Sequence, residues 1–259
     1  MLELIRHDAI HELRLARAPV NALDPALVHS LREAVDAAPG DGARVIVLSG
    51  LPGLFSAGLD LPALLQLDHD GLHAFMTDFF GLCSALAGSP IPVVSAVTGH
   101  SPAGGAVLAI MGDYRVMARS ADPAKPFRIG LNEVQVGLPV PEPIQFALRR
   151  LVGTYRAERL LTAGAMIDSE RALALGFVDE LVDTEHVVAR AIEWAREWLQ
   201  LPEHAARETR HLARADLAAT LCDPEKLPVA TFVADWFLPE VQARLHAVVE
   251  QLKSKAKSR

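Results

Sequence analysis

The stretch that decides the fold is residues 90–105, which read PIPVVSAVTGHSPAGG. Val93–Val97 predicts a short buried strand, because it is mostly apolar and is bounded by prolines and a glycine. The turn residues that follow include Pro102, and Gly104–Met111 then continues as an apolar helix. A buried strand that enters a helix through a glycine turn is typical of α/β proteins with a mostly parallel sheet.

The same alternation continues on both sides of this stretch. Asp24-Pro25 predicts the start of a helix, with an N-cap and a proline in the first turn, and Pro39-Gly40 predicts its end. The other predicted elements are a hairpin of Leu2–Ile5 and Ile10–Leu15, strands at Val45–Leu48, Tyr114–Ala118 and Val178–Val182, and helices at Leu61–Leu67 and Leu72–Leu86. From His186 onward only helices are predicted. We therefore expect an α/β core over 1–185 and a helical region over 186–259.

Composition excludes several classes of protein. The chain has 259 residues, 51% of them hydrophobic, and a net charge of −7, so a large core is expected and general nucleic-acid binding is disfavoured. Two distant cysteines, Cys83 and Cys222, rule out a disulfide framework. The uncharged stretch Phe79–Gly112 is interrupted by prolines and glycines, and residues 1–8 carry charges, which predicts a soluble cytoplasmic protein without a membrane partner.

Two apparent catalytic signals fail on chemical grounds. Ser101 lies in a sequence resembling a nucleophile elbow, but the next residue is Pro102, which has no backbone N–H to donate to an oxyanion. His69 and His73 share a helical face, yet the sequence supplies no third ligand, so we predict no metal site. Gly99–Gly105 is also not a phosphate-binding loop, since it lacks the terminal Gly-Lys-Ser/Thr, and no G-x-G-x-x-G follows a strand.

Two glycine turns remain, Phe55–Leu61 and Val97–Gly105, and each follows a buried strand. Turns of this kind can direct two backbone N–H groups at one point and form an oxyanion hole. Together with other segments they resemble the crotonase (enoyl-CoA hydratase/isomerase) superfamily over nearly the whole chain. The segments that carry the resemblance, in order, are APVNAL (18–23), FSAGLDL (55–61), PIPVVSAVTG (90–99), AGG (103–105), GDYR (112–115), RLVG (150–153), LLTAG (160–164) and ALALGFV (172–178).

The resemblance implies a fold, a substrate and a set of site residues. Crotonase-like proteins wind ββα units into a spiral, end in helices, and form trimers or dimers of trimers. They bind acyl-CoA thioesters, so coenzyme A enters as part of the substrate and no separate cofactor is expected. By similarity, the N–H groups of Leu59 and Gly104 hold the enolate oxygen. The positions implied to bind pantetheine and adenine are Pro19, Val20, Asn21, Ser56, Ala57, Gly58, Asp60 and Leu61. Lys253 or Lys255 could reach the CoA phosphates, although a solvated tail is an equal alternative.

The carboxylates separate the reactions within this superfamily. Hydratases of the family use two glutamates, and the position of the first is Val107 here, which cannot position water or move a proton. The second survives as Glu133 in GLNEVQVG (130–137). This pattern resembles the Δ3,Δ2-enoyl-CoA isomerases, in which one glutamate would move a proton from C2 to C4. Apolar neighbours of Glu133 predict a pocket that raises its pKa.

Several alternatives stay open at this stage. The segment 119–127 is longer than expected, and it could shift Glu133 or bulge outside. Glu142 could be a second carboxylate for dienoyl-CoA isomerisation, or an exposed residue near a helix start. Weak hydration of enoyl-CoA and a non-catalytic acyl-CoA-binding trimer are further hypotheses for the function. Six residues could line the acyl pocket or merely fill the core: Leu64, Leu65, Leu67, Phe75, Phe79 and Leu82.

Overall fold

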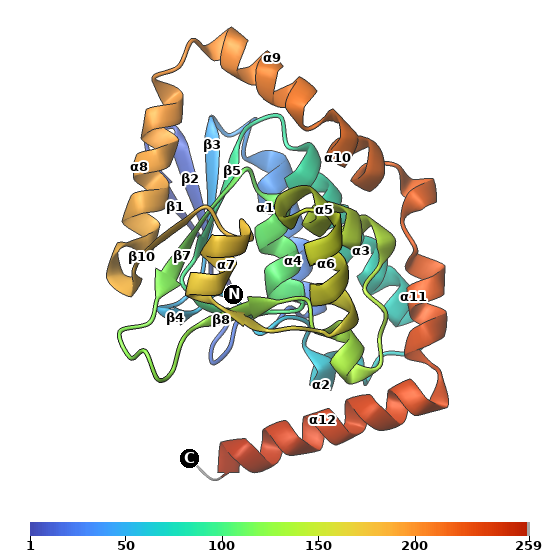
Figure 1. Cartoon of the computed structure of the whole chain (residues 1–259). Coiled ribbons are helices and arrows are strands. Elements are labelled where there is room, and N and C mark those ends of the chain that lie inside the picture. The colour runs from blue at the N-terminus through green and yellow to red at the C-terminus, as the bar shows by residue number, and fades with distance from the viewer. Residues whose placement is uncertain (258–259) are drawn as a thin grey trace.

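The computed structural model describes residues 1–257, with side chains as far as residue 254, and it contains two sheets (Figure 1). The larger sheet has the order β1-β2-β3-β5-β7-β10. Its first pair is antiparallel and its other pairs are parallel. The strands are β1 (Leu2–His7), β2 (Ile10–Leu15), β3 (Val45–Ser49), β5 (Val93–Val97), β7 (Tyr114–Arg119) and β10 (Glu180–Asp183). The predicted hairpin and parallel sheet are confirmed.

A smaller sheet lies at the end of the larger one where the glycine turns occur. Its order is β4-β6-β8-β9, and the strands are β4 (Gly53–Leu54), β6 (Gly99–Pro102), β8 (Arg128–Gly130) and β9 (Ile167–Asp168). Gly99 allows β4 and β6 to pair, because a Cβ there would lie 1.9 Å from the carbonyl carbon of Gly53. This second sheet was not predicted from the sequence.

Helices cover both faces of the larger sheet (Figure 1). One face packs against α1 (Pro25–Ala37), α3 (His69–Gly88) and α4 (Gly104–Met111). The other face packs against α8 (Val187–Leu199), which contacts β3, β5, β7 and β10. The predicted start of α1 is confirmed, since the Asp24 carboxylate accepts a hydrogen bond from Leu27 N at 2.8 Å and Pro25 opens the helix.

The C-terminal helices run around the outside of this core (Figure 1). After α9 (Glu203–Ala213), helices α10 (Ala215–Leu221) and α11 (Val229–Trp236) pack on α3. Helix α12 (Pro239–Lys257) then contacts α2 (Leu61–Leu64) and the short 3-10 turn η1 (Glu133–Val136). The remaining elements are α5 (Glu142–Val152), α6 (Thr154–Thr162), α7 (Ser169–Leu175), η2 (Thr184–His186) and η3 (Pro224–Lys226).

Several predicted boundaries were wrong, and the helix predicted over Leu72–Leu86 spans His69–Gly88. The helix predicted over 61–67 ends at Leu64, because Asp68 accepts a hydrogen bond from Gly71 N at 2.8 Å and begins α3 instead. The strand predicted from Val178 begins at Glu180, since the Val178 N–H donates to the carbonyl of Ala172 within α7. Among the described helices, none is both long enough and apolar enough to span a membrane.

Candidate active site

A cavity of about 460 Å³ lies between the two glycine turns, the start of α4, and the C-terminal helices. Most of its lining is apolar. Part of the lining comes from α3, α4, η1, α5, α11 and α12, and further parts come from α2 and from the loops that include residues 17–22 and 57–60. The apolar lining residues include Met76, Phe79, Phe80, Val107, Val136, Leu138, Ile144, Phe232, Val248 and Leu252. Leu64, Phe75 and Leu82 instead belong to the core and do not line it. A cavity of this kind excludes much of the water around any polar group it contains.

The two glycine turns meet at one side of the cavity. A Cβ on Gly58 would lie 3.1 Å from Gly104 N, and a Cβ on Gly104 would lie 3.3 Å from Leu59 N. Gly58 also has φ of +83°, a conformation that favours glycine. The Leu23 N–H donates to the Gly58 carbonyl at 2.8 Å and fixes the first turn. The backbone nitrogens of Leu59 and Gly104 are therefore held close together.

The second turn points its backbone toward the cavity through a strained residue. Ala103 has φ of +44°, and its N–H donates to the Gly130 carbonyl at 2.8 Å. Gly104 follows as the first residue of α4, where a helix leaves its N–H groups without partners and carries a partial positive charge. Among the described residues, neither the Leu59 N–H nor the Gly104 N–H has a hydrogen-bond acceptor. The pair can hold a developing oxyanion.

Glu133 is the first residue of η1, and its side chain enters the same cavity. Its Oε2 atom is buried and has no hydrogen-bond partner within the described part of the chain. Burial raises the pKa of Glu133 to about 7, although a hydrogen bond from its own backbone acts in the opposite direction. Val107, only 3% exposed, lines the cavity from α4. A carboxyl group with this pKa can both take and return a proton near neutral pH.

The other acidic residue of the described lining is already engaged. Asp60 forms an ion pair with Arg17 at 2.7 Å and accepts a hydrogen bond from Ala63 N at 3.1 Å. Arg17 also pairs with Asp24 at 2.9 Å. Asp60 therefore serves as a charge partner and helix cap, and Glu133 is left as the carboxyl group free to exchange protons.

The candidate residues predicted from the sequence fall into two groups. Pro19, Val20, Ala57, Leu59, Asp60, Leu61, Gly104 and Glu133 line the cavity. Asn21, Ser56 and Gly58 lie behind its wall, where the Ser56 hydroxyl donates to the Asn21 carbonyl at 2.7 Å and accepts from Gly58 N at 3.1 Å. Asn21 Nδ2 donates to the Phe55 carbonyl at 3.0 Å. These three residues join the two loops that form the wall.

The alternatives left open by the sequence have clear places in the structure. The segment 120–126 bulges at the surface between β7 and β8, and it does not carry Glu133 away from the cavity. Glu142 is the first residue of α5, is exposed, and pairs with Arg149 outside the cavity. Lys253 Nζ pairs with Glu250 at 2.8 Å, and both of these α12 side chains are exposed, whereas the Lys255 side chain lies outside the described residues.

Sequence reasoning missed several lining residues. Asn132 precedes Glu133, lines the cavity, and has a buried Oδ1 atom without a partner among the described residues. Its place in the GLNE motif was the available signal. Arg17 reaches the cavity beside Asp60, and Phe232, Val248 and Leu252 reach it from α11 and α12. No local pattern distinguishes those three from ordinary core positions.

Comparison with known proteins agrees with this geometry. A sequence profile described as "Enoyl-CoA hydratase/isomerase" matches residues 6–258. The chain belongs to the enoyl-CoA hydratase/isomerase family. It is therefore a crotonase-family protein, and the predicted α/β crotonase fold is confirmed.

Relatives in this family carry two kinds of name. "Enoyl-CoA delta isomerase 1, mitochondrial" of Mus musculus is 32% identical over 245 residues, covering 94% of this chain and 83% of the relative. "Probable enoyl-CoA hydratase EchA17" of Mycobacterium bovis is 36% identical over 198 residues, covering 74% and 72%. The crystal structure of human mitochondrial delta3-delta2-enoyl-CoA isomerase has a TM-score of 0.91 at 28% identity, covering 98% of both chains.

Proposed function

We propose that this enoyl-CoA hydratase/isomerase family protein is a Δ3,Δ2-enoyl-CoA isomerase, converting 3-enoyl-CoA into trans-2-enoyl-CoA. The observation that carries the proposal is a single unpaired carboxyl group, Glu133, in an apolar cavity with Val107 where a second carboxyl group would be needed for hydration. The isomerase names of the mouse and human relatives support the same reaction.

The proposed reaction needs one base and one oxyanion site. The thioester carbonyl oxygen accepts hydrogen bonds from the N–H groups of Leu59 and Gly104, which acidifies the protons on C2. The Glu133 carboxylate removes a C2 proton, and the electron pair moves into a dienolate with its charge on the thioester oxygen. The protonated Glu133 then returns the proton to C4, and the double bond shifts to C2–C3. Removal of one oxyanion donor typically costs about 10²–10³-fold in rate.

A second candidate function is hydration of 2-enoyl-CoA, which is supported by the hydratase name of the mycobacterial relative. Water would then need a second group to position it, and the lining offers Asn132 but no second free carboxylate among the described residues. Dienoyl-CoA isomerisation through Glu142 is disfavoured, because that side chain is exposed and paired with Arg149. A non-catalytic acyl-CoA-binding protein is the remaining alternative.

The test uses trans-3-hexenoyl-CoA and follows the rise of conjugated 2-enoyl thioester absorbance, with crotonyl-CoA hydration measured in parallel. Isomerisation without hydration is the expected result. Hydration as the faster reaction would overturn the assignment. Failure of both reactions, with hexanoyl-CoA binding but without deuterium incorporation at C2 or C4 in D₂O, would establish the non-catalytic alternative.

The assembly belongs to the proposal as well. We propose a homotrimer or a dimer of trimers in which the C-terminal helical region contributes contacts. Large apolar side chains exposed there support this, among them Leu201, Leu212, Phe237 and Leu238. Light scattering coupled to gel filtration tests it, and a monomer at all concentrations would contradict it. The cytoplasmic location stays a prediction from the sequence.

A further inference from the structure

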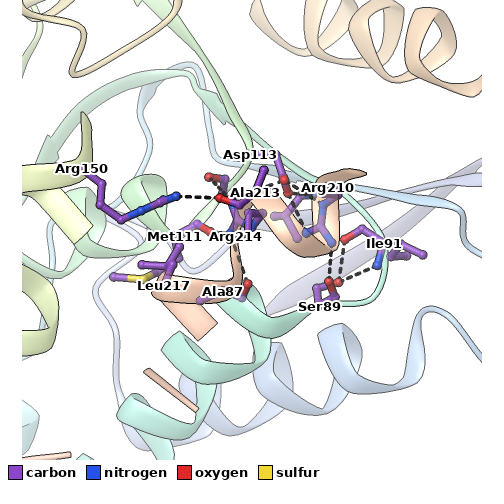
Figure 2. A network of polar contacts seen from close by, with 12 residues as sticks. Ala87, Ser89, Ile91, Met111, Asp113, Arg150, Arg210, Ala213, Arg214 and Leu217 are labelled. Atoms are coloured by element: carbon purple, nitrogen blue, oxygen red, sulfur yellow. Dashed lines mark hydrogen bonds and ion pairs between the residues drawn. The ribbon is translucent and has the colours of Figure 1, made fainter. Parts of the chain in front are cut away.

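A second, smaller cavity is lined by four arginines. It has a volume of about 250 Å³ and lies where α4, α5, α9 and α10 come together. We call it the arginine cavity; its lining is Ile110, Gly112, Asp113, Arg115, Ala147, Arg150, Leu151, Arg210, Ala213 and Arg214. None of these residues lines the candidate active site. Figure 2 shows Arg150, Arg210 and Arg214 converging on this region beside Asp113.

Positive charge exceeds negative charge inside the arginine cavity. Asp113 is the one carboxylate of its described lining, and Arg210 binds it through two nitrogens at 2.8 and 2.9 Å. Arg115 and Arg150 pair instead with Asp179 at 2.6 Å and Asp216 at 2.8 Å, and neither of those aspartates lines the cavity. Arg214 has only a 3.4 Å contact to the already engaged Asp113.

Arg214 is the guanidinium with the weakest charge compensation. It donates to the carbonyls of Met111 at 2.6 Å and Ala87 at 3.3 Å, at the C-terminal ends of α4 and α3 (Figure 2). It also donates to the Gly112 carbonyl at 3.2 Å. Burial lowers the pKa of Arg214, and the like charges of Arg210, Arg150 and Arg115 add to that effect, while Asp113 opposes it. Such a cluster is costly to bury unless an anion compensates it.

Two donors of the cluster are unused. The Nε atoms of Arg115 and Arg214 are buried and have no hydrogen-bond acceptor among the described residues. Arg115 is only 3% exposed, so bulk water cannot replace a missing partner. Arg150 and Ala213 lie at the solvent-exposed rim, which leaves an entry for a small ligand. Guanidinium groups are suited to the oxygens of phosphate, to which they donate charge-assisted hydrogen bonds.

We propose that the arginine cavity is a binding site for a phosphate-class oxyanion, separate from the acyl-CoA cavity. The oxyanion pairs with the guanidinium groups of Arg150 and Arg214, which line the arginine cavity, and supplies the negative charge that Asp113 alone does not. The proposal does not depend on the reaction assigned to Glu133.

The probe is inorganic phosphate, titrated into the full-length protein by calorimetry and by thermal unfolding at constant ionic strength balanced with NaCl. Phosphate is expected to bind and to raise the unfolding temperature. Arg150→Gln should weaken phosphate binding about tenfold or more, because the positive charge at the exposed rim of the cavity is lost. Arg149→Gln is the matched control, since Arg149 is the neighbouring arginine of α5 and pairs with Glu142 away from the cavity. It should bind phosphate like the wild type.

A second variant adds a negative charge to the cavity instead of removing a positive one. Ala213→Asp places a carboxylate at the exposed rim, and it should raise the unfolding temperature in phosphate-free buffer and abolish the phosphate response. Equal stabilisation by NaCl, or equal affinities of the Arg150→Gln and Arg149→Gln variants, would overturn the proposal. Loss of phosphate binding in the presence of saturating hexanoyl-CoA would also overturn it, because phosphate would then occupy the CoA site.

Discussion

Replacing Glu133 with Gln tests two effects of the buried carboxyl group, its cost to the stability of the folded protein and its proposed role in turnover. The pKa of the Glu133 side chain rises from the ordinary glutamate value of 4.5 to about 7 in the folded protein. At pH values between these two pKa values, the folded state binds more protons than the unfolded state. The free energy of unfolding therefore falls as the pH rises. Above pH 7 the full cost of keeping Glu133 ionised in the cavity is about 3 kcal/mol, at 1.36 kcal/mol per pKa unit.

The Glu133→Gln variant has no charge to bury, so this cost should be missing. Between about pH 5 and about pH 8, the free energy of unfolding of the wild type should fall relative to the variant by about 2.5 kcal/mol. Urea unfolding of both proteins at the same protein concentration measures that difference. A difference that does not change with pH would refute the assignment of a buried, readily protonated Glu133.

The same variant should lose isomerase turnover, because the amide of Gln cannot accept the C2 proton. General acid–base groups typically contribute about 10²–10⁴-fold. For the wild type, kcat/KM should rise with pH through an apparent pKa near 7, since the carboxylate is the active base. Glu142→Gln removes an equal charge outside the cavity and should retain turnover. Substantial activity of Glu133→Gln alongside normal hexanoyl-CoA binding would disprove the catalytic role.

Three further substitutions test the oxyanion site, the missing carboxylate and the apolar wall. Gly104→Ala brings a Cβ to 3.3 Å from Leu59 N, and it should lower kcat about 10²–10³-fold with acyl-CoA binding retained in a binding assay. Val107→Glu adds a second carboxyl group, and crotonyl-CoA hydration should become detectable while isomerisation falls. Val248→Ser makes the apolar lining of the cavity that holds Glu133 more polar. The pH profile of kcat/KM should therefore shift toward acid, whereas an unchanged profile would contradict a desolvation origin of the raised pKa.

The larger sheet was accessible from the sequence because its strands are long enough to carry an apolar signal. Val93–Val97 and the capped helix after Asp24 were both placed correctly for that reason. The smaller sheet could not be predicted from the sequence, since β4 and β9 have two residues each and β8 has three. Strands that short show no periodicity, and their pairing depends on segments far away in the chain.

The candidate site was only partly accessible for a related reason. A motif resemblance assigns positions such as Asn21 and Ser56 to a binding loop, but it does not say which side of the loop faces the ligand. Here their polar groups tie the two loops together behind the wall, through bonds of 2.7 and 3.0 Å. Burial and hydrogen bonding between distant segments decide that difference, and neither is a property of local sequence.

The raised pKa of Glu133 links this local chemistry to the end of the chain. Desolvation is its main cause, and part of the apolar wall that excludes water is contributed by Phe232 and Val248 from α11 and α12. Arg244 of α12 also donates to the Gln135 carbonyl at 3.0 Å and fastens the turn that carries Glu133. These remote helices therefore contribute to the burial that raises the pKa of Glu133. The proposed role of Glu133 as a base therefore depends on the C-terminal helices as well as on its own motif.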